Sequence, residues 1–146
     1  MRKSLQAVPL EAAVVILGIL TLLPLLASFQ VPRQLRWREE LSRLSSLNAK
    51  LMWVYGGFIV GMIFGLGAFL IAFATEVADG SPPALAVLGF GCVFWTVRLL
   101  IDAIVFKPAD WPAGATNRVG RTLLDTLFVT LTLGYWSIFV WLLVAG

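Results

Sequence analysis

Long runs of apolar residues alternate with short polar segments along this chain of 146 residues. A helix of roughly 20 residues can cross the hydrocarbon core of a membrane, and each run reaches that length. The four runs cover residues 8–28, 51–75, 85–106 and 122–145. Because backbone amides in lipid must bond within their own helix, the pattern predicts an all-α membrane protein, a bundle of four transmembrane helices.

Composition favours a membrane protein over a soluble one. Apolar residues make up 60% of the chain and charged residues only 13%, whereas about a quarter of a soluble domain is charged. The mean hydropathy is +0.92, and a small soluble domain must instead cover itself with polar side chains. We therefore treat residues 1–146 as a single membrane domain.

The polar segment between the first two runs contains a further helical pattern. Residues 36–47 are typical of a short amphipathic helix that lies on the membrane surface. Its apolar face would consist of Trp37, Leu41, Leu44 and Leu47. Charged side chains fall mostly on the opposite face, so we expect this helix to orient the bundle at the interface.

Positive charge is distributed unevenly between the connecting loops. Residues 30–50 and 107–121 carry eight of the 11 lysines and arginines, whereas only Arg2 and Lys3 belong to the opposite side. Loops rich in Lys and Arg stay in the cytoplasm. We expect both basic loops to be cytoplasmic and both termini to lie outside a bacterial-type inner membrane.

The first apolar run follows Arg2 and Lys3, as the core of a signal peptide would. Two features favour its retention as a helix of the mature protein: the run is longer than a normal signal-peptide core, and Glu11 interrupts its start. We interpret Glu11 as an interfacial residue that stabilises the helix N-terminus.

Missing residue types exclude several kinds of chemistry. The chain has no histidine, which excludes imidazole haem ligation, His-based zinc or di-iron sites and a Ser-His-Asp triad. The single cysteine, Cys92, cannot form an intrachain disulfide or a redox pair. Nucleotide-binding and nucleophile-elbow motifs are also missing. We expect no enzyme activity, no cofactor, no metal and no nucleic-acid partner.

Small residues recur at four-residue spacing in two of the runs. The second run contains Gly57, Gly61 and Gly65, and the fourth contains Thr126, Thr130 and Gly134. Residues four apart stack on one helix face, and glycine lets a neighbouring backbone approach closely. We interpret both stripes as helix-packing faces. Packing within the chain is the first expectation, and dimerisation is the alternative.

Three charged residues interrupt the last two runs. Arg98 and Asp102 are four residues apart on one face of the third run, and Asp125 lies one turn inside the fourth from the same side. Unpaired, Arg and Asp would cost roughly 5–7 kcal/mol at the membrane centre, so we expect the three to meet. The cluster is interpreted either as a structural ion pair or as a site for an anion, a lipid headgroup or a proton.

Two aromatic pairs fall near the middle of the same runs, Phe94-Trp95 and Tyr135-Trp136. Packing between helices accounts for them, and a pocket for a flat apolar ligand is the alternative.

Two function hypotheses follow. The first is a non-enzymatic accessory or assembly component of a membrane complex, because the chain has short outer loops and no cofactor ligands. The second is a small homo-oligomeric transporter or channel that uses Arg98 with Asp102 or Asp125. Besides the lipid bilayer, the expected partners are other membrane subunits or further copies of the chain.

Overall fold

The computed structural model describes residues 2–107 and 114–145, and all regular structure within these ranges is α-helical. The helices, in chain order, are α1 (Arg2–Gln34), α2 (Trp37–Ser42), α3 (Ser46–Ala72), α4 (Ala74–Ala78), α5 (Pro82–Ile104) and α6 (Ala115–Ala145). Four of them are long and apolar enough to cross a membrane. This confirms the all-α four-helix bundle and gives the chain the make-up of a multi-pass membrane protein.

The last three spanning segments begin earlier than the apolar runs suggested, and the first ends later. They cover Pro9–Gln34, Ser46–Ala72, Pro82–Ile104 and Asn117–Val144. A helix includes polar residues before its apolar run when a residue that favours helix initiation precedes them in the sequence. Ser45 caps α3, its hydroxyl accepting from the Asn48 amide at 3.4 Å, and the proline pair at the start of α5 suits a first helical turn.

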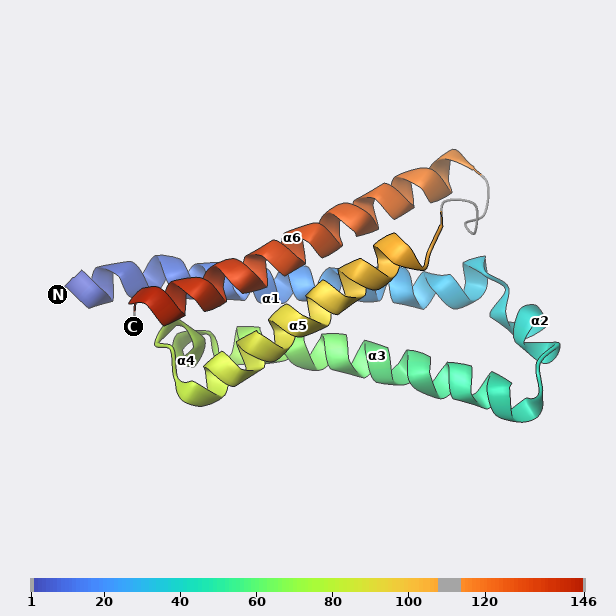
Figure 1. The fold of residues 1–146 in the computed structure, drawn as a ribbon, viewed down its shortest axis with the longest axis horizontal. Helices are drawn as coiled ribbons and strands as arrows, with labels where there is room; N and C mark the ends of the chain where they lie inside the picture. Colours follow the sequence, from blue (N-terminus) through green and yellow to red (C-terminus); the bar gives the residue numbers. More distant parts are fainter. Residues whose placement is uncertain (1, 108–113, 146) are drawn as a thin grey trace.

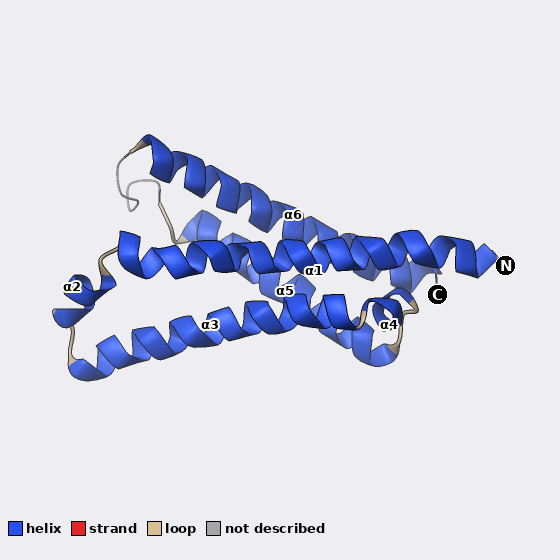
Figure 2. Cartoon of the chain, turned by 180° about the vertical axis from the view of Figure 1, so that it is seen from behind, coloured by secondary structure: helices blue, strands red, loops and turns tan. Residues whose placement is uncertain are grey.

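α1 runs along the length of the bundle and holds its two halves together (Figure 1). It packs on α3 and α4 along one side, while α5 packs on α6, and α1 joins the two pairs by contacting α6. Both termini and α4 lie at one end, and α2 lies at the other (Figures 1 and 2). From the end that holds the termini, α1 and α6 diverge towards the opposite end.

The core forms where α1, α3, α5 and α6 come together. Its buried side chains include Val14, Leu17, Leu70, Leu88, Cys92, Trp95, Phe128, Leu131 and Tyr135. Cys92 is thus a small buried side chain, free of disulfide bonding. Because α1 supplies part of this core, its removal as a signal peptide would leave the remaining helices without a central partner.

Close packing between α1 and α3 occurs at Gly18 and Gly67. A Cβ at Gly67 would lie 2.6 Å from Leu22 Cδ2 and 3.0 Å from the Gly18 carbonyl oxygen. A Cβ at Gly18 would lie 3.0 Å from the Gly67 carbonyl oxygen and 2.8 Å from Ile71 Cγ1. The two glycines therefore allow the backbones to approach each other, as small residues do between membrane helices.

Gly67→Ala is expected to destabilise the bundle by about 1–3 kcal/mol, because its methyl group meets backbone that cannot rotate away. Thermal unfolding in a mild detergent measures this effect. Gly65→Ala is the matched control two residues earlier, since nothing lies within 4 Å of a Cβ there. Equal melting temperatures for the two variants would contradict the close contact.

The predicted glycine stripe on α3 lies on a different face from Gly67. No atom of the described residues lies within 4 Å of a Cβ placed at Gly57, Gly61 or Gly65. The expectation that this stripe packs within the chain is therefore wrong, because α1 contacts the face that carries Gly67 instead. Its use between chains stays a prediction.

The stripe on α6 is divided between two environments. Gly134 packs against α1, where a Cβ would lie 2.8 Å from Leu17 Cδ1. Thr126 and Thr130 are exposed, and each hydroxyl donates to the carbonyl four residues earlier in its own helix, at 2.8 Å. Only Gly134 of this stripe packs against another helix within the described residues.

The amphipathic helix expected over residues 36–47 is shorter in the structure. α2 ends at Ser42, and the Ser45 cap starts α3, so Leu47 belongs to the spanning helix and is exposed. Leu41 alone of the predicted apolar face is buried. Trp37 packs edge-on against Trp53, with ring centroids 5.3 Å apart, and this contact holds α2 against the start of α3.

Candidate functional site

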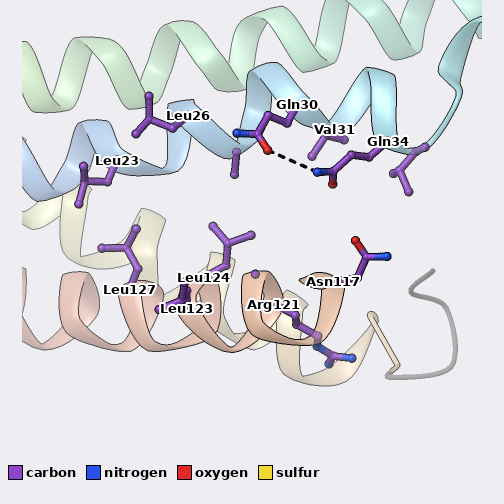
Figure 3. Close-up of a pocket in the computed structure, with 13 residues that line it drawn as sticks. Leu23, Leu26, Gln30, Val31, Gln34, Asn117, Arg121, Leu123, Leu124 and Leu127 are labelled. Atoms are coloured by element: carbon purple, nitrogen blue, oxygen red, sulfur yellow. Dashed lines mark hydrogen bonds between the residues drawn. The ribbon is translucent and has the colours of Figure 1, made fainter. Parts of the chain in front are cut away.

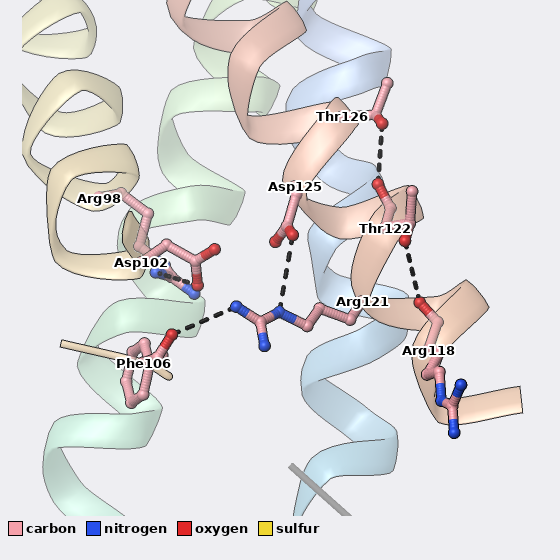
Figure 4. Close-up of polar contacts among 8 residues, drawn as sticks. All are labelled: Arg98, Asp102, Phe106, Arg118, Arg121, Thr122, Asp125 and Thr126. Carbon is pink, nitrogen blue, oxygen red and sulfur yellow. Dashed lines mark hydrogen bonds and ion pairs between the residues drawn. The ribbon is translucent and has the colours of Figure 1, made fainter. Parts of the chain in front are cut away.

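Charged side chains from α5 and α6 gather near the end of the bundle that carries α2 (Figure 4). Arg98 Nη1 lies 3.3 Å from Asp102 Oδ1, one helical turn away on α5. Asp102 is buried, whereas nearly a third of the Arg98 side chain is exposed. The predicted pair therefore forms, and its carboxylate is the member that cannot reach solvent.

Arg121 is a member of this cluster that sequence reasoning missed. Its Nε lies 3.6 Å from Asp125 Oδ2, and its Nη2 donates to the Phe106 carbonyl at 3.2 Å (Figure 4). The sequence interpretation placed Arg121 in a loop, but α6 begins at Ala115. Arg121 therefore lies on the helix, one turn before Asp125.

The two ion pairs interact with each other across α5 and α6. Asp125 has electrostatic interactions with Asp102, Arg121 and Arg98. We call these four residues the charge cluster. With two arginines and two aspartates its formal charge is zero, so the predicted meeting of Arg98, Asp102 and Asp125 occurs with an additional compensating cation.

Aromatic rings cover the guanidinium group of Arg98. Its Cζ lies 4.4 Å from the centre of the Phe128 ring and 5.8 Å from that of Phe106. Phe128 also stacks on Trp95, with centroids 5.9 Å apart. A cation over a ring face is stabilised more strongly away from water. This packing and the ion pair together hold Arg98 between the helices.

Scans against protein-family models, curated proteins and solved structures found no match to this chain. Function is therefore argued from the geometry alone.

A buried hydrogen bond links α1 with α6 in the core of the bundle. The Thr21 hydroxyl donates to the Leu17 carbonyl at 2.8 Å, so the Tyr135 hydroxyl, 3.2 Å away, must donate to Thr21. Trp95 is fully buried, and its Nε1 interacts with the Tyr135 side chain but has no hydrogen-bond partner of good geometry among the described residues. These rings pack between helices, which agrees with the interpretation of the aromatic pairs as packing residues.

The second aromatic of the α6 pair makes a separate contact between helices. Trp136 Nε1 donates to the Thr96 hydroxyl at 3.0 Å, and that hydroxyl donates to the Cys92 carbonyl at 2.7 Å. At the other end of the bundle, the Thr75 hydroxyl donates to Glu11 at 2.9 Å. Because α1 begins at Arg2, Glu11 lies well inside the helix and pairs with α4 rather than stabilising a helix start.

A cleft of about 330 Å³ separates α1 from α6 where the two helices diverge (Figure 3). Its walls are mainly leucine side chains, with Gln30, Gln34, Asn117 and Arg121 at one end. Among the described residues, no group of three or more His, Cys, Asp or Glu side chains is placed to hold a metal ion. Within the described residues, the charge cluster, this cleft and the exposed glycine face of α3 are candidate sites.

Proposed function

We propose that this chain is a non-enzymatic accessory or assembly component of a membrane complex and binds its partner through the outer face of α3. This face carries the exposed stripe of Gly57, Gly61 and Gly65. Along it runs a shallow groove of about 370 Å³, lined by Val54, Gly57, Phe58, Gly61 and Met62. The open space above three glycines in register is the observation that supports the proposal.

The three glycines of the α3 stripe lower the stability of the isolated chain. Glycine in a helix costs about 1 kcal/mol relative to alanine, and this stripe gains no contact in return within the described structure. Gly18 and Gly67 differ, because each allows close contact between α1 and α3. Since apolar surface gives no drive to associate in lipid, close backbone packing is a main source of helix association there. A second helix lying along the stripe would supply that packing.

The charge cluster supports a structural role more than a transport role. Each arginine has a carboxylate partner in its own helix, and the four formal charges sum to zero. The bond from Arg121 to the Phe106 carbonyl and the packing of Arg98 on Phe128 then connect α6 with the end of α5 without an added ion. The rival hypothesis, a homo-oligomeric transporter or channel, would need Arg98 or Asp102 to bind and release a substrate. Asp102 is buried against Arg98, which disfavours such exchange.

We place the two basic loops in the cytoplasm and both termini outside an inner membrane. The structure puts α2 and the facing ends of α5 and α6 at one end of the bundle, opposite the termini (Figures 1 and 2). The eight lysines and arginines of the two basic loops all lie at described positions and thus share one side. Loops with this charge remain in the cytoplasm.

Gly61→Leu is expected to weaken partner binding about tenfold or more, because a four-carbon side chain would keep a second helix from the α3 backbone. The measurement is quantitative co-purification from native membranes in mild detergent, followed by native mass analysis. The chain itself should fold normally, since nothing lies within 4 Å of a Cβ at Gly61.

Gly120→Leu serves as the matched control, because its Cβ also meets no described residue within 4 Å but lies on α6. A stoichiometric foreign subunit that is lost from Gly61→Leu and kept by Gly120→Leu would support the proposal. A complex made only of this chain would contradict the accessory role and favour the transporter hypothesis. Retention of the partner by Gly61→Leu would exclude the α3 face.

A further inference from the structure

We propose that a pocket between the end of α1, α2 and the start of α3 binds the headgroup of one anionic phospholipid. The pocket lies at the end of the bundle opposite the termini (Figures 1 and 2). Its volume of about 580 Å³ is that of a small-ligand site. Its lining includes Phe29, Arg33, Arg36, Arg38, Glu39 and Trp53. No lining residue is shared with the α3 groove of the proposed function, so either site can fail while the other stands.

Positive charge is in excess in this pocket. Three arginines and one glutamate give the lining a formal charge of +2, and all three arginines are exposed. Glu39 pairs with Arg36. Neither Arg33 nor Arg38 forms an ion pair with a described residue, in contrast to both arginines of the charge cluster. A guanidinium group suits a phosphate because it presents several donors in one plane. The charge of the pocket therefore selects an anion.

Arg36 adopts a backbone conformation that arginine rarely takes. It connects α1 with α2 at φ 49° and ψ 42°, in the left-handed region that favours glycine. Its ion pair with Glu39 is exposed and contributes little to stability, so the pair does not account for an arginine at a strained position. Strained backbone of this kind is concentrated at ligand-binding sites. We interpret the arginine as retained for its cation, which lies at the pocket.

The residues of the pocket follow the order of the parts of a phospholipid. Gln34 ends the first spanning segment, so Arg33 lies at the expected membrane boundary. Phe29 stands one turn earlier in α1, about 6 Å nearer the membrane centre. Trp53 lies two turns inside α3, and half of it is exposed. A phospholipid with its phosphate at the arginines would place its glycerol and acyl chains beside these two rings. A soluble phosphate would leave both rings uncovered, which favours the lipid.

The test is native mass analysis of the full chain in mild detergent, titrated with phosphatidylglycerol or with phosphatidylcholine of identical acyl chains. We expect one phosphatidylglycerol per chain, bound about tenfold more tightly than phosphatidylcholine, because Arg33 and Arg38 each attract an anionic lipid. The double variant Arg33→Gln with Arg38→Gln should lose this preference. Glu39→Gln should bind phosphatidylglycerol more tightly than the unmodified chain, since it removes the carboxylate that competes for Arg36.

Arg36→Gly separates binding from folding. Glycine accepts the left-handed conformation without strain, so this variant should melt no lower than the unmodified protein. It should nevertheless bind phosphatidylglycerol about fivefold more weakly, because a cation of the pocket is lost. Binding equal to that of the unmodified chain would show that the arginine is not retained for the lipid and would overturn the proposal.

Arg43→Gln is the matched control for the charge changes. Arg43 lies at the end of α2, outside the pocket, and pairs with Glu40. The control removes the same charge from the same side of the membrane and should bind like the unmodified chain. Glycerol phosphate, which lacks acyl chains, should fail to displace the lipid. Three results would overturn the proposal: equal binding of the two lipids by the unmodified chain, equal losses in Arg43→Gln and the double variant, or displacement by glycerol phosphate.

Discussion

Gly91→Ala is expected to lower the stability of the bundle by about 2–3 kcal/mol, a large effect for one methyl group. A Cβ at Gly91 would lie 2.2 Å from Tyr135 Cε1 and 2.4 Å from Cδ1, far inside contact distance. Tyr135 is fully buried, so its ring has no solvent-facing space into which it can move. The added methyl must separate α5 from α6 or push the ring away.

Moving the ring has a second consequence. The Tyr135 hydroxyl bonds to Thr21 at 3.2 Å, and this bond connects α6 with α1. A shifted ring would leave both hydroxyl groups buried with one bond fewer, and an unsatisfied buried polar group costs about 1–3 kcal/mol. The substitution on α5 should therefore weaken the contact between α6 and α1 as well.

Thermal unfolding in mild detergent, followed by tryptophan fluorescence, measures the effect of Gly91→Ala. Gly89→Ala is the control two residues earlier, because its Cβ would make an ordinary contact at 3.4 Å with Phe139 Cε2. It should melt close to the unmodified protein. A Gly91→Ala protein that melts with the control would show that Tyr135 has room to move and would contradict the packing described here.

The spanning helices could be predicted from the sequence because the lipid environment leaves few alternatives. A run of about 20 apolar residues that must satisfy its own backbone becomes a helix whichever neighbours it has. The ends of the helices were harder to predict, since they depend on local signals such as the Ser45 cap. One such end, the start of α6, explains why Arg121 was assigned to a loop and left out of the cluster.

The spacing of small residues did not predict which face of a helix packs against its neighbour. Gly57, Gly61 and Gly65 form a regular stripe, yet the contact with α1 uses Gly67. The four-residue period shows only that small residues share a face. Which neighbour covers that face depends on contacts between distant segments, here α1 with α3. Gly18 and Gly91 do not belong to a four-residue repeat of small residues, and their packing roles were therefore missed.

The Arg98–Asp102 pair was predictable for a different reason. Charges inside an apolar run are expensive unless paired, and a separation of four residues on a helix brings two side chains together. The approach of Asp125 was expected as well, but the rest of the environment was not predictable, because Phe128 and Arg121 come from α6. The unequal burial of the two partners, visible only in the structure, decides what their removal should do.

Arg98→Leu is expected to cost about 2–3 kcal/mol, because it leaves the Asp102 carboxylate without its ion-pair partner in a buried position. The full cost of a broken buried pair is not expected, since nearly a third of the Arg98 side chain is exposed. Asp102→Leu should cost less, about 1 kcal/mol, because the longer arginine can extend towards solvent and still lie over Phe128.

The double variant separates a structural pair from a pair retained for binding. Arg98→Leu with Asp102→Leu should recover most of the lost stability, because two apolar side chains replace both charges and Arg121 remains paired with Asp125. Melting of all four proteins in detergent at neutral pH and moderate salt completes the cycle. Equal stability of all four proteins, or no recovery in the double variant, would contradict a structural role. The cluster would then have to be explained by a ligand that it holds, which is the prediction of the transporter hypothesis.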